Sequence, residues 1–237
     1  MKKMTKKELK SLLDDFRNKE GEAYLDLTYI IIRTKKLEGM DFSRVDFSNS
    51  DFKNVNFRSC KFDNAKLQHT KFENCDLSGS SFAYADLFSA DLRACDLSGS
   101  NFDGADFFAA LLWEAKLDNL LVTDRTKFFR NYCPEAGYIF GYKKCFNERM
   151  VQLLIPKDAK RCSSTTNACR CDKARVVAIT DVNKKESYKE AMSFVDPNFI
   201  YRLGEMVYAD SYNEDRWHDS SHGIHFWMTF EEALGYM

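Results

Sequence analysis

A large apolar residue recurs at every fifth position through the middle of this 237-residue chain. Every fifth residue from Leu37 to Leu117 is Phe or Leu, which makes seventeen positions without a slip. An α-helix spaces its apolar residues by three and four, and a half-buried strand spaces them by two. The period of five therefore indicates neither element, but a backbone that turns once in each repeat.

Other positions of the repeat also carry restricted residue types. The residue before the large apolar one is often Asp or Asn, and the residue two before it is usually small, as at Cys75, Ala85 and Cys95. We expect the large and the small side chain to point inward and the other three to face water. Residues that tolerate unusual backbone angles gather two positions after the large one: Gly39, Asn49, Asn54, Asn64, Asn74, Gly79, Gly99 and Gly104.

The unit small–Asp/Asn–Phe/Leu–polar–polar resembles the pentapeptide-repeat family over about a third of the chain. The resemblance implies a β-solenoid, namely a right-handed quadrilateral β-helix with one pentapeptide on each face and four in each coil. Wrapping the chain in this way puts Cys75 next to Cys95, as two buried small residues or as a redox pair. It also stacks one inner column of rings: Phe42, Phe62, Phe82 and Phe102.

The residues before the repeat, 1–36, are predicted to form an N-terminal helix and cap. Thr5 and Glu8 form a capping box, and Gly21 ends the predicted helix. The β-forming stretch 23–32 is expected to add a first coil that is out of phase with the repeat. A solenoid needs such a cap because its open ends expose unpaired backbone groups.

The five-residue period fails after Asn119, which gives three predicted domains: 1–36, 37–120 and 121–237. Residues 124–130 read as a linker. The remainder predicts a small α+β domain with mostly antiparallel strands, beginning with a hairpin over 138–155. A second capping box, Thr229 with Glu232, opens a last helix. Further strands are predicted over 174–180, 224–228 and 198–208, the last bent or divided at Gly204.

The residues from Tyr138 onward resemble a domain of unknown function that follows pentapeptide repeats in bacteriophage and bacterial proteins. The strings that carry the resemblance include GYKK, ACRCDKARVVAI, FIYRLGEMV and GIHFWMTFEEALGY. The resemblance implies a phage, prophage or bacterial origin, and it brings no assigned activity.

Composition excludes several classes of partner. The net charge is −1, so no bulk attraction to nucleic acid or to anionic lipid is expected. No window approaches the run of apolar residues that a membrane span requires. The basic N-terminus lacks the apolar segment of a signal peptide, so we predict a cytoplasmic protein of a bacterial host cell with reduced thiols at its eight cysteines.

Two phenylalanines interrupt the polar outer surface of the predicted solenoid. Phe88 and Phe108 occupy the first outward position of their repeats, twenty residues apart, and Tyr84 and Trp113 lie nearby in the wrap. A contiguous apolar patch usually marks a docking surface. We predict that Phe88 and Phe108 are covered by the C-terminal domain or by a second copy of the chain. If both rings are open to solvent, the patch, with Tyr84 and Trp113, is the candidate site for a protein partner.

The solenoid also carries an acidic half. From Glu73 to Asp118, nine acidic residues stand against two basic ones. Some pentapeptide-repeat proteins resemble B-DNA in size and charge and inhibit DNA gyrase, as the quinolone-resistance proteins do. A DNA-mimicking inhibitor is therefore one alternative function. Against it, Asp belongs to the repeat itself, and the predicted rod is short.

Metal binding is one candidate chemistry of the C-terminal domain. Cys162, Cys169 and Cys171, together with His222, offer the thiolate and imidazole ligands that zinc prefers. Their spacing is not that of a standard zinc knuckle, and the adjacent SSTTNA reads as a flexible surface loop. Free thiols in or beside this loop are the interpretation we prefer.

Catalysis is the other candidate chemistry. The segment GIHF, followed by Ala233 and Tyr236, resembles part of the ADP-ribosyltransferases, with His225 where that family has Tyr. With Tyr201 and Glu205 as further candidates, an ADP-ribosyltransferase-like enzyme is a second alternative function. His225 could also pair with a nearby carboxylate as an acid–base pair, but no nucleophile is spaced to join it.

Taken together, the sequence favours a non-enzymatic protein-binding protein without cofactor or bound metal. It predicts a rigid β-helix with a helical cap, fused to a small α+β domain, that docks on a protein partner. A homo-oligomer is compatible with this prediction, whereas direct contact with nucleic acid or membrane is not expected.

Overall fold

The computed structural model describes residues 1–19, 24–33 and 36–236 of the chain. It divides into two compact units, Met1–Arg130 and Asn131–Met237. Gly21 and Ala23, at the expected end of the first helix and start of the first coil, lie outside the described residues.

The first unit begins with β1 (Lys2–Lys3) and helix α1 (Lys6–Asn18). The predicted capping box is confirmed, because the Thr5 hydroxyl accepts a hydrogen bond from the Glu8 N–H at 3.3 Å and the Glu8 carboxylate accepts from the Thr5 N–H at 2.8 Å. The helix buries one apolar face, formed by Leu9, Leu13 and Phe16.

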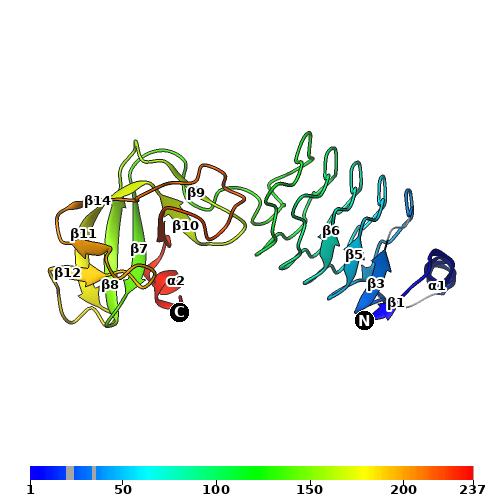
Figure 1. Cartoon of the computed structure of the whole chain (residues 1–237), viewed down its shortest axis with the longest axis horizontal. Coiled ribbons are helices and arrows are strands. Elements are labelled where there is room, and N and C mark those ends of the chain that lie inside the picture. The colour runs from blue at the N-terminus through cyan, green and yellow to red at the C-terminus, as the bar shows by residue number, and fades with distance from the viewer. Residues whose placement is uncertain (20–23, 34–35, 237) are drawn as a thin grey trace. The chain divides into compact units, whose positions relative to one another are not determined.

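The rest of the first unit is a β-solenoid, whose coils Figure 1 shows stacked one after another. Residues that open the repeats pair in parallel with residues twenty further along the chain, so one coil contains twenty residues. One sheet has the order β1-β3-β5-β6, and β2 pairs with β4. The strands are short: β2 (Leu25–Asp26), β3 (Ile30–Arg33), β4 (Val45–Asp46), β5 (Asp51–Lys53) and β6 (Lys71–Glu73).

The backbone of the solenoid turns at nearly every fifth residue. The eight Gly and Asn residues predicted for this register all have positive φ, between 52° and 71°, which confirms that prediction. The same register holds bulkier residues in the left-handed region, including His69 at 54° and Tyr84 at 58°. The repeating hydrogen bonds of the coil therefore impose the turn even where the residue does not favour it.

The large apolar residues fill the axis of the solenoid as predicted. Phe62 and Phe82 stack with their ring centroids 4.9 Å apart, and Phe82 stacks on Phe102 at the same distance. All three side chains are fully buried. The repeat thus builds a continuous aromatic column, which is a large hydrophobic contribution to stability.

Cys75 and Cys95 lie in the small inner column, where both are buried free thiols. The Cys95 thiol donates a hydrogen bond to the Phe72 carbonyl at 2.9 Å. Burial raises the pKa of both thiols to about 12. Protonated, buried and close to backbone carbonyls, they behave as small core residues rather than as a redox pair.

Two predictions about the ends of the solenoid are wrong. The first coil is in phase, because Leu27 and Ile32 are buried at the fivefold positions and β2 pairs with β4 twenty residues on. The apolar residues between these two positions hid the phase. Residues 124–130, which were predicted to be a linker, belong to the first unit, where Lys127 pairs with Asp106. This coil has twenty-one residues instead of twenty, so the regular spacing did not indicate the pairing.

The second unit is an α+β fold with mostly antiparallel strands. The sheets have the orders β14-β11-β8-β7 and β15-β10-β9, and β12 pairs with β13. Helix α2 (Phe230–Leu234) opens with the predicted capping box of Thr229 and Glu232. The predicted first hairpin is confirmed as the pairing of β7 with β8. The strands are β7 (Ile139–Cys145), β8 (Arg149–Ile155), β9 (Arg161–Ser163), β10 (Cys169–Cys171), β11 (Lys173–Asp181), β12 (Glu190–Met192), β13 (Ile200–Arg202), β14 (Met206–Tyr208) and β15 (Ile224–Phe226).

The two larger sheets meet at a backbone bridge between Tyr142 and Trp227. Each of these residues donates its N–H to the other's carbonyl at 2.8 Å. Gly141 permits this approach, because a Cβ there would lie 2.4 Å from the ring of Phe226. At Gly204, with φ of 85°, the predicted bent strand divides into β13 and β14, which pair with different strands.

The expectation of a flexible surface loop at SSTTNA is wrong. Ser163, Ser164 and Thr165 are buried. The guanidinium of Arg216 donates to the Ser163 carbonyl at 2.9 Å and to the Ser164 carbonyl at 3.1 Å. Small polar residues indicate a loop when read locally, but a distant arginine satisfies these backbone groups and allows their burial.

Candidate functional site

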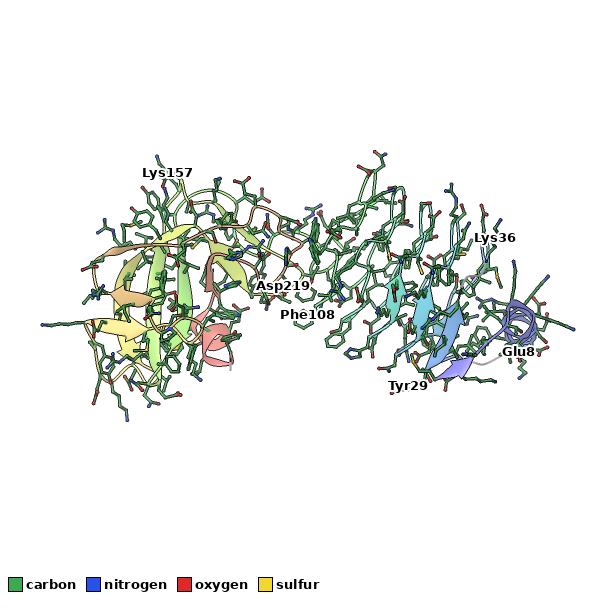
Figure 2. All side chains as sticks on the ribbon, in the orientation of Figure 1. Glu8, Tyr29, Lys36, Phe108, Lys157 and Asp219 are labelled. Atoms are coloured by element: carbon green, nitrogen blue, oxygen red, sulfur yellow. The ribbon has the colours of Figure 1, made fainter. Side chains whose placement is uncertain are left out.

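A row of aromatic rings runs along the outside of the solenoid. The ring centroids are 5.2 Å apart between His69 and Phe88, 5.8 Å apart between Phe88 and Phe108, and 4.8 Å apart between Phe108 and Phe128. Figure 2 shows the Phe108 side chain projecting away from the ribbon. These four residues are named the aromatic ladder.

The repeat itself positions the ladder. Phe88 follows the buried Leu87, and Phe108 occupies the same place one coil later. The Asp86 carboxylate accepts a hydrogen bond from the Phe88 N–H at 3.0 Å, and Asp106 does the same for Phe108 at 3.1 Å. These bonds fix the local turns, and the spacing of the coils then brings the rings into stacking contact.

Half of the ladder is open to solvent: His69 is exposed and Phe88 is 36% exposed, whereas Phe108 and Phe128 are half-buried. Tyr84 and Trp113, the other two predicted interaction residues, are 52% and 37% exposed. Tyr84 lies at a turn against Gly104, where a Cβ would come within 2.6 Å of its ring. A single exposed ring is common on proteins, but a row of rings in contact with one another is typical of a contact surface.

Sequence reasoning missed two members of the ladder. Phe128 falls after the apparent end of the repeat, so its relation to Phe108 twenty residues earlier was not used. His69 occupies a turn position, which is one residue away from the column that contains Phe88. Phe128 lies in the last coil, where Asp106 pairs with Lys127 across twenty-one residues, so the regular repeat did not indicate its place.

The carboxylates of the solenoid serve its own structure. Those before the large apolar residue accept the N–H two residues on, as Asp46 does from Ser48 at 3.0 Å and Asp96 from Ser98 at 3.0 Å. Cations from neighbouring coils pair with many carboxylates, among them the pairs Arg33–Asp51, Lys116–Asp96, Arg125–Asp103 and Lys127–Asp106. Much of the negative charge is therefore used within the solenoid, and less is left to imitate phosphates.

The candidate zinc ligands are distributed over three elements of the second unit. Cys162 lies in β9, Cys169 and Cys171 lie in β10, and His222 precedes β15. All three thiols are buried and free, and burial raises the pKa of Cys171. Within the described residues, no group of three or more His, Cys, Asp or Glu side chains has the arrangement of a metal site.

The candidate catalytic residues occupy three different environments. Tyr201 is 1% exposed in the core, whereas Glu205 is exposed just before β14. His225 pairs with Arg170 across β15 and β10, and its Nε2 is buried without a hydrogen-bond partner in the described part of the chain. Burial, helped by the cations Lys143 and Arg170, lowers the pKa of His225 to about 4. This imidazole is therefore neutral at ordinary pH.

Two family models match separate parts of the chain. Residues 34–102 match the description "Pentapeptide repeat region", and residues 129–233 match the "Family of unknown function (DUF5758)". The chain thus contains a pentapeptide repeat region followed by a domain of unknown function. No curated protein matches the chain.

Similar solved structures are pentapeptide repeat proteins. One from the thylakoid lumen of Arabidopsis thaliana is 29% identical, with 40% of this chain and 66% of that one covered and a TM-score of 0.39. QnrB1, a plasmid-mediated fluoroquinolone resistance protein, is 24% identical, with 40% and 56% covered and a TM-score of 0.33. Rfr23 from the cyanobacterium Cyanothece 51142 is 17% identical, with 50% and 97% covered and a TM-score of 0.27. The chain thus spans less than two thirds of the first two.

Proposed function

We propose that this chain is a non-enzymatic protein-binding protein whose aromatic ladder docks on a protein partner. The observation that carries the proposal is the stack of Phe88 on Phe108, at 5.8 Å, on the outside of a mostly polar solenoid. A partner can bury only the part of each ring that is still exposed, about a third for Phe88, and at about 25 cal/mol per Å² this contributes on the order of 1–2 kcal/mol for each ring. Aromatic anchors of this kind dominate many protein interfaces.

The proposed architecture is a right-handed quadrilateral β-helix with residues 1–36 as its cap. The turn at nearly every fifth residue in a coil of twenty supports four faces. Contacts of α1 support the cap: the Arg17 guanidinium donates to the Asp41 carboxylate at 3.2 Å, and the Arg44 guanidinium lies 5.5 Å from the centre of the Phe16 ring. A capped rod of this kind presents its outer residues in fixed positions.

The proposed setting is the cytoplasm of a bacterial host cell, with a phage or prophage as the source. Eight free cysteines are consistent with a reducing compartment. Among the described residues, helices long and apolar enough to cross a membrane are absent. The resemblance of the second unit to a domain of phage and bacterial proteins supports the proposed source.

Affinity capture with matched variants tests the ladder. The double variant Phe88→Ser/Phe108→Ser and the control Arg93→Ser are immobilised alongside the unchanged protein and exposed to host lysate. Arg93 is an exposed outward residue that pairs with Asp91 of its own repeat. We expect partner proteins to bind the unchanged protein and the control but not the double variant, while melting curves show all three folded.

An unchanged set of captured proteins on the double variant would contradict a docking role for the ladder. The two alternative functions gain less support. The carboxylates needed for DNA mimicry are hydrogen-bonded to turns and paired with cations. Tyr201, a candidate for nucleotide binding in a transferase, lies inside the core of the second unit.

A further inference from the structure

Two of the eight free cysteines lie in contact in the second unit, and protein docking through the ladder uses neither of them. Cys169 belongs to β10, whereas Cys133 belongs to the irregular segment 131–138 that precedes β7. The Cys169 thiol donates a hydrogen bond to the Cys133 sulfur. Cysteines must lie this close to be joined by a disulfide bond, so the two thiols form a candidate dithiol pair.

Hydrogen bonds of neighbouring residues bring the two thiols together. Ser163 of β9 lies directly opposite Cys169 in the antiparallel pairing with β10, so both side chains point to the same face. The Ser163 hydroxyl accepts a hydrogen bond from the Tyr132 N–H at 2.7 Å, and the Asn131 side-chain oxygen accepts from the Ser163 N–H at 3.1 Å. The residues just before Cys133 are therefore held against this face of the sheet, beside Cys169.

Side-chain contacts fasten the same segment at both of its ends. The Tyr132 hydroxyl donates to the Glu232 carboxylate, which belongs to the capping box of α2, at 2.6 Å. The Arg161 guanidinium donates to the Gly137 carbonyl at 2.8 Å. These contacts keep the segment closed over the side chain of Cys133, which is 2% exposed.

Cys133 is the more accessible and the more reactive of the two thiols. Tyr132 before it and residues 134–138 after it are exposed, and the segment lies outside the helices and strands. Outward movement of the segment therefore exposes Cys133 without breaking a sheet. The hydrogen bond from Cys169, helped by the positive charge of Arg161, lowers the pKa of Cys133 although burial acts the other way. The thiolate is the reactive form of cysteine.

We propose that Cys133 and Cys169 form a redox switch, which small disulfides such as oxidised glutathione close into an intramolecular disulfide. The Cys133 thiol releases its proton to water, and its thiolate attacks one sulfur of the small disulfide, so a mixed disulfide forms and one small thiolate departs. Cys169 then releases its proton and attacks the Cys133 sulfur, and the second small thiolate departs. Both departing thiolates take up protons, so two protein thiols are oxidised as one small disulfide is reduced to two thiols.

Oxidation of the full chain with oxidised glutathione under native conditions tests the proposal. Samples are quenched with acid over time, the remaining thiols are alkylated, and peptide mass spectrometry without reduction identifies the linked cysteines. We expect the first disulfide to join Cys133 to Cys169 and to be reversed by dithiothreitol. A first disulfide between Cys169 and Cys162, or a glutathione adduct at Cys133 that never converts to a disulfide, would overturn the proposal, and the unchanged protein gives either result.

Three single variants assign the order of the two steps. Cys169→Ser should accumulate the glutathione adduct at Cys133, because no second thiol resolves it, whereas Cys133→Ser should leave Cys169 unmodified. Cys145→Ser removes a buried thiol of β7 and should form the disulfide as fast as the unchanged protein. Near-ultraviolet circular dichroism checks that the variants are folded. An adduct that forms first at Cys169 would contradict the assigned order.

Limited proteolysis tests whether the disulfide restrains the segment. A protease that cleaves after glutamate can cut at Glu135, which is exposed in segment 131–138, and at Glu148, which is exposed in the turn between β7 and β8. Oxidation should slow cleavage at Glu135 several-fold and leave cleavage at Glu148 unchanged, because only the first site lies in the segment that the disulfide ties to β10. Equal cleavage at Glu135 before and after oxidation would show that the disulfide is no switch.

Discussion

The two units of this chain bury their side chains according to different rules. In the solenoid, the place of a residue within its five-residue repeat determines whether it faces the axis, as Phe62 and Phe82 do. In the second unit, Lys143 and Arg170 are 5% and 2% exposed although both side chains are ionisable. A repeat makes burial a local property of the sequence, whereas elsewhere the partner strands decide it.

Lys143 illustrates how partner strands decide burial in the second unit. Its side chain lies on the inward face of β7, between the inward positions of Gly141 and Cys145. The ammonium donates to the His225 carbonyl at 3.2 Å, and burial lowers the pKa of Lys143. Alternation along the strand could indicate an inward position here, but only the fold supplies the carbonyl that accepts from the ammonium.

The largest effect on stability is expected when a charged residue replaces a large apolar residue on the axis of the solenoid. Phe82→Asp should unfold the first unit, because the carboxylate would replace a fully buried ring that stacks at 4.9 Å on both Phe62 and Phe102. An unpaired buried charge costs several kcal/mol, comparable with the stability of a whole domain. Circular dichroism during thermal unfolding measures the loss.

Phe82→Leu is the matched control, since Leu occupies the equivalent position in other repeats. It should retain the fold with a loss of about 1–2 kcal/mol. A Phe82→Asp variant that melts close to the unchanged protein would show that the column is not the core of the solenoid.

The same contrast explains how much could be predicted from the sequence. The repeat predicted the inner ring column, the turn register of Gly39 and Asn49, and the outward place of Phe88 and Phe108. It failed where one extra residue hid the pairing of Lys127 with Asp106. In the second unit, a capping box and a hairpin were predictable because they are local.

The surroundings of Cys162 could not be predicted in the same way. The Cys162 sulfur accepts a hydrogen bond from the hydroxyl of Tyr212, fifty residues away along the chain, and the neighbouring carbonyls accept from Arg216, which is even further. Nothing in the spacing of these residues indicates that they meet. The apparent loop after Cys162 led instead to the idea of free surface thiols, because local reading could not supply the carbonyl contacts of Arg216.

Removing one arginine from each unit compares the stability that a buried and an exposed arginine contribute. Arg170 donates to the backbone carbonyls of His218, Asn213 and Asp215. Arg170→Ala should destabilise the second unit by about 3 kcal/mol, because several carbonyls lose their donor in a buried setting. Arg93→Ala, which removes an exposed partner of Asp91, should change stability by less than about 1 kcal/mol. Chemical denaturation of both variants provides the comparison, and equal losses would contradict it.

Acid should weaken the second unit through His225. Its pKa falls from 6.5 to about 4 in the folded protein, mainly through burial. The unfolded chain therefore binds a proton that the folded chain does not, and stability is complete above pH 6.5 and declines as the pH falls towards 4. The shift corresponds to a loss of about 3 kcal/mol at the acid end.

Denaturant unfolding of the second unit between these pH values measures the decline. The variant His225→Gln should show a flatter dependence, because the amide does not titrate. A decline of the same size in this variant would assign the acid sensitivity to other groups.

Alanine substitutions at two glycines in the same turn register distinguish the stability cost of backbone strain from that of a side-chain clash. Gly39 and Gly104 have φ of 70° and 71°, but a Cβ meets nothing within 4 Å at Gly39 and comes within 2.6 Å of the Tyr84 ring at Gly104. Gly39→Ala should cost about 1–2 kcal/mol from the left-handed backbone alone. Gly104→Ala should cost more, and Tyr84→Ala should remove the excess in a double-mutant cycle. Equal costs of the two glycine variants would show that Tyr84 moves aside freely.

The smallest effect is expected when a carboxylate of the solenoid loses its charge but keeps its hydrogen bond. Asp86 accepts from the Phe88 N–H at 3.0 Å and from the Gln68 amide at 2.6 Å. In Asp86→Asn the amide oxygen still accepts from Phe88, and the Gln68 amide can rotate to present its own oxygen to the new amide group. Asn56 and Asn101 already hold the same turn with bonds of 2.9 Å.

Asp86→Asn should therefore change the free energy of unfolding by less than about 0.5 kcal/mol, whereas Asp86→Ala should cost about 1 kcal/mol because the Phe88 N–H loses its acceptor. Denaturant unfolding of the two variants measures the difference. A large loss in Asp86→Asn would mean that the charge itself holds the turn. A small loss there and a larger one in Asp86→Ala would establish the carboxylate as a turn acceptor, which ties the acidic surface to the repeat rather than to a partner.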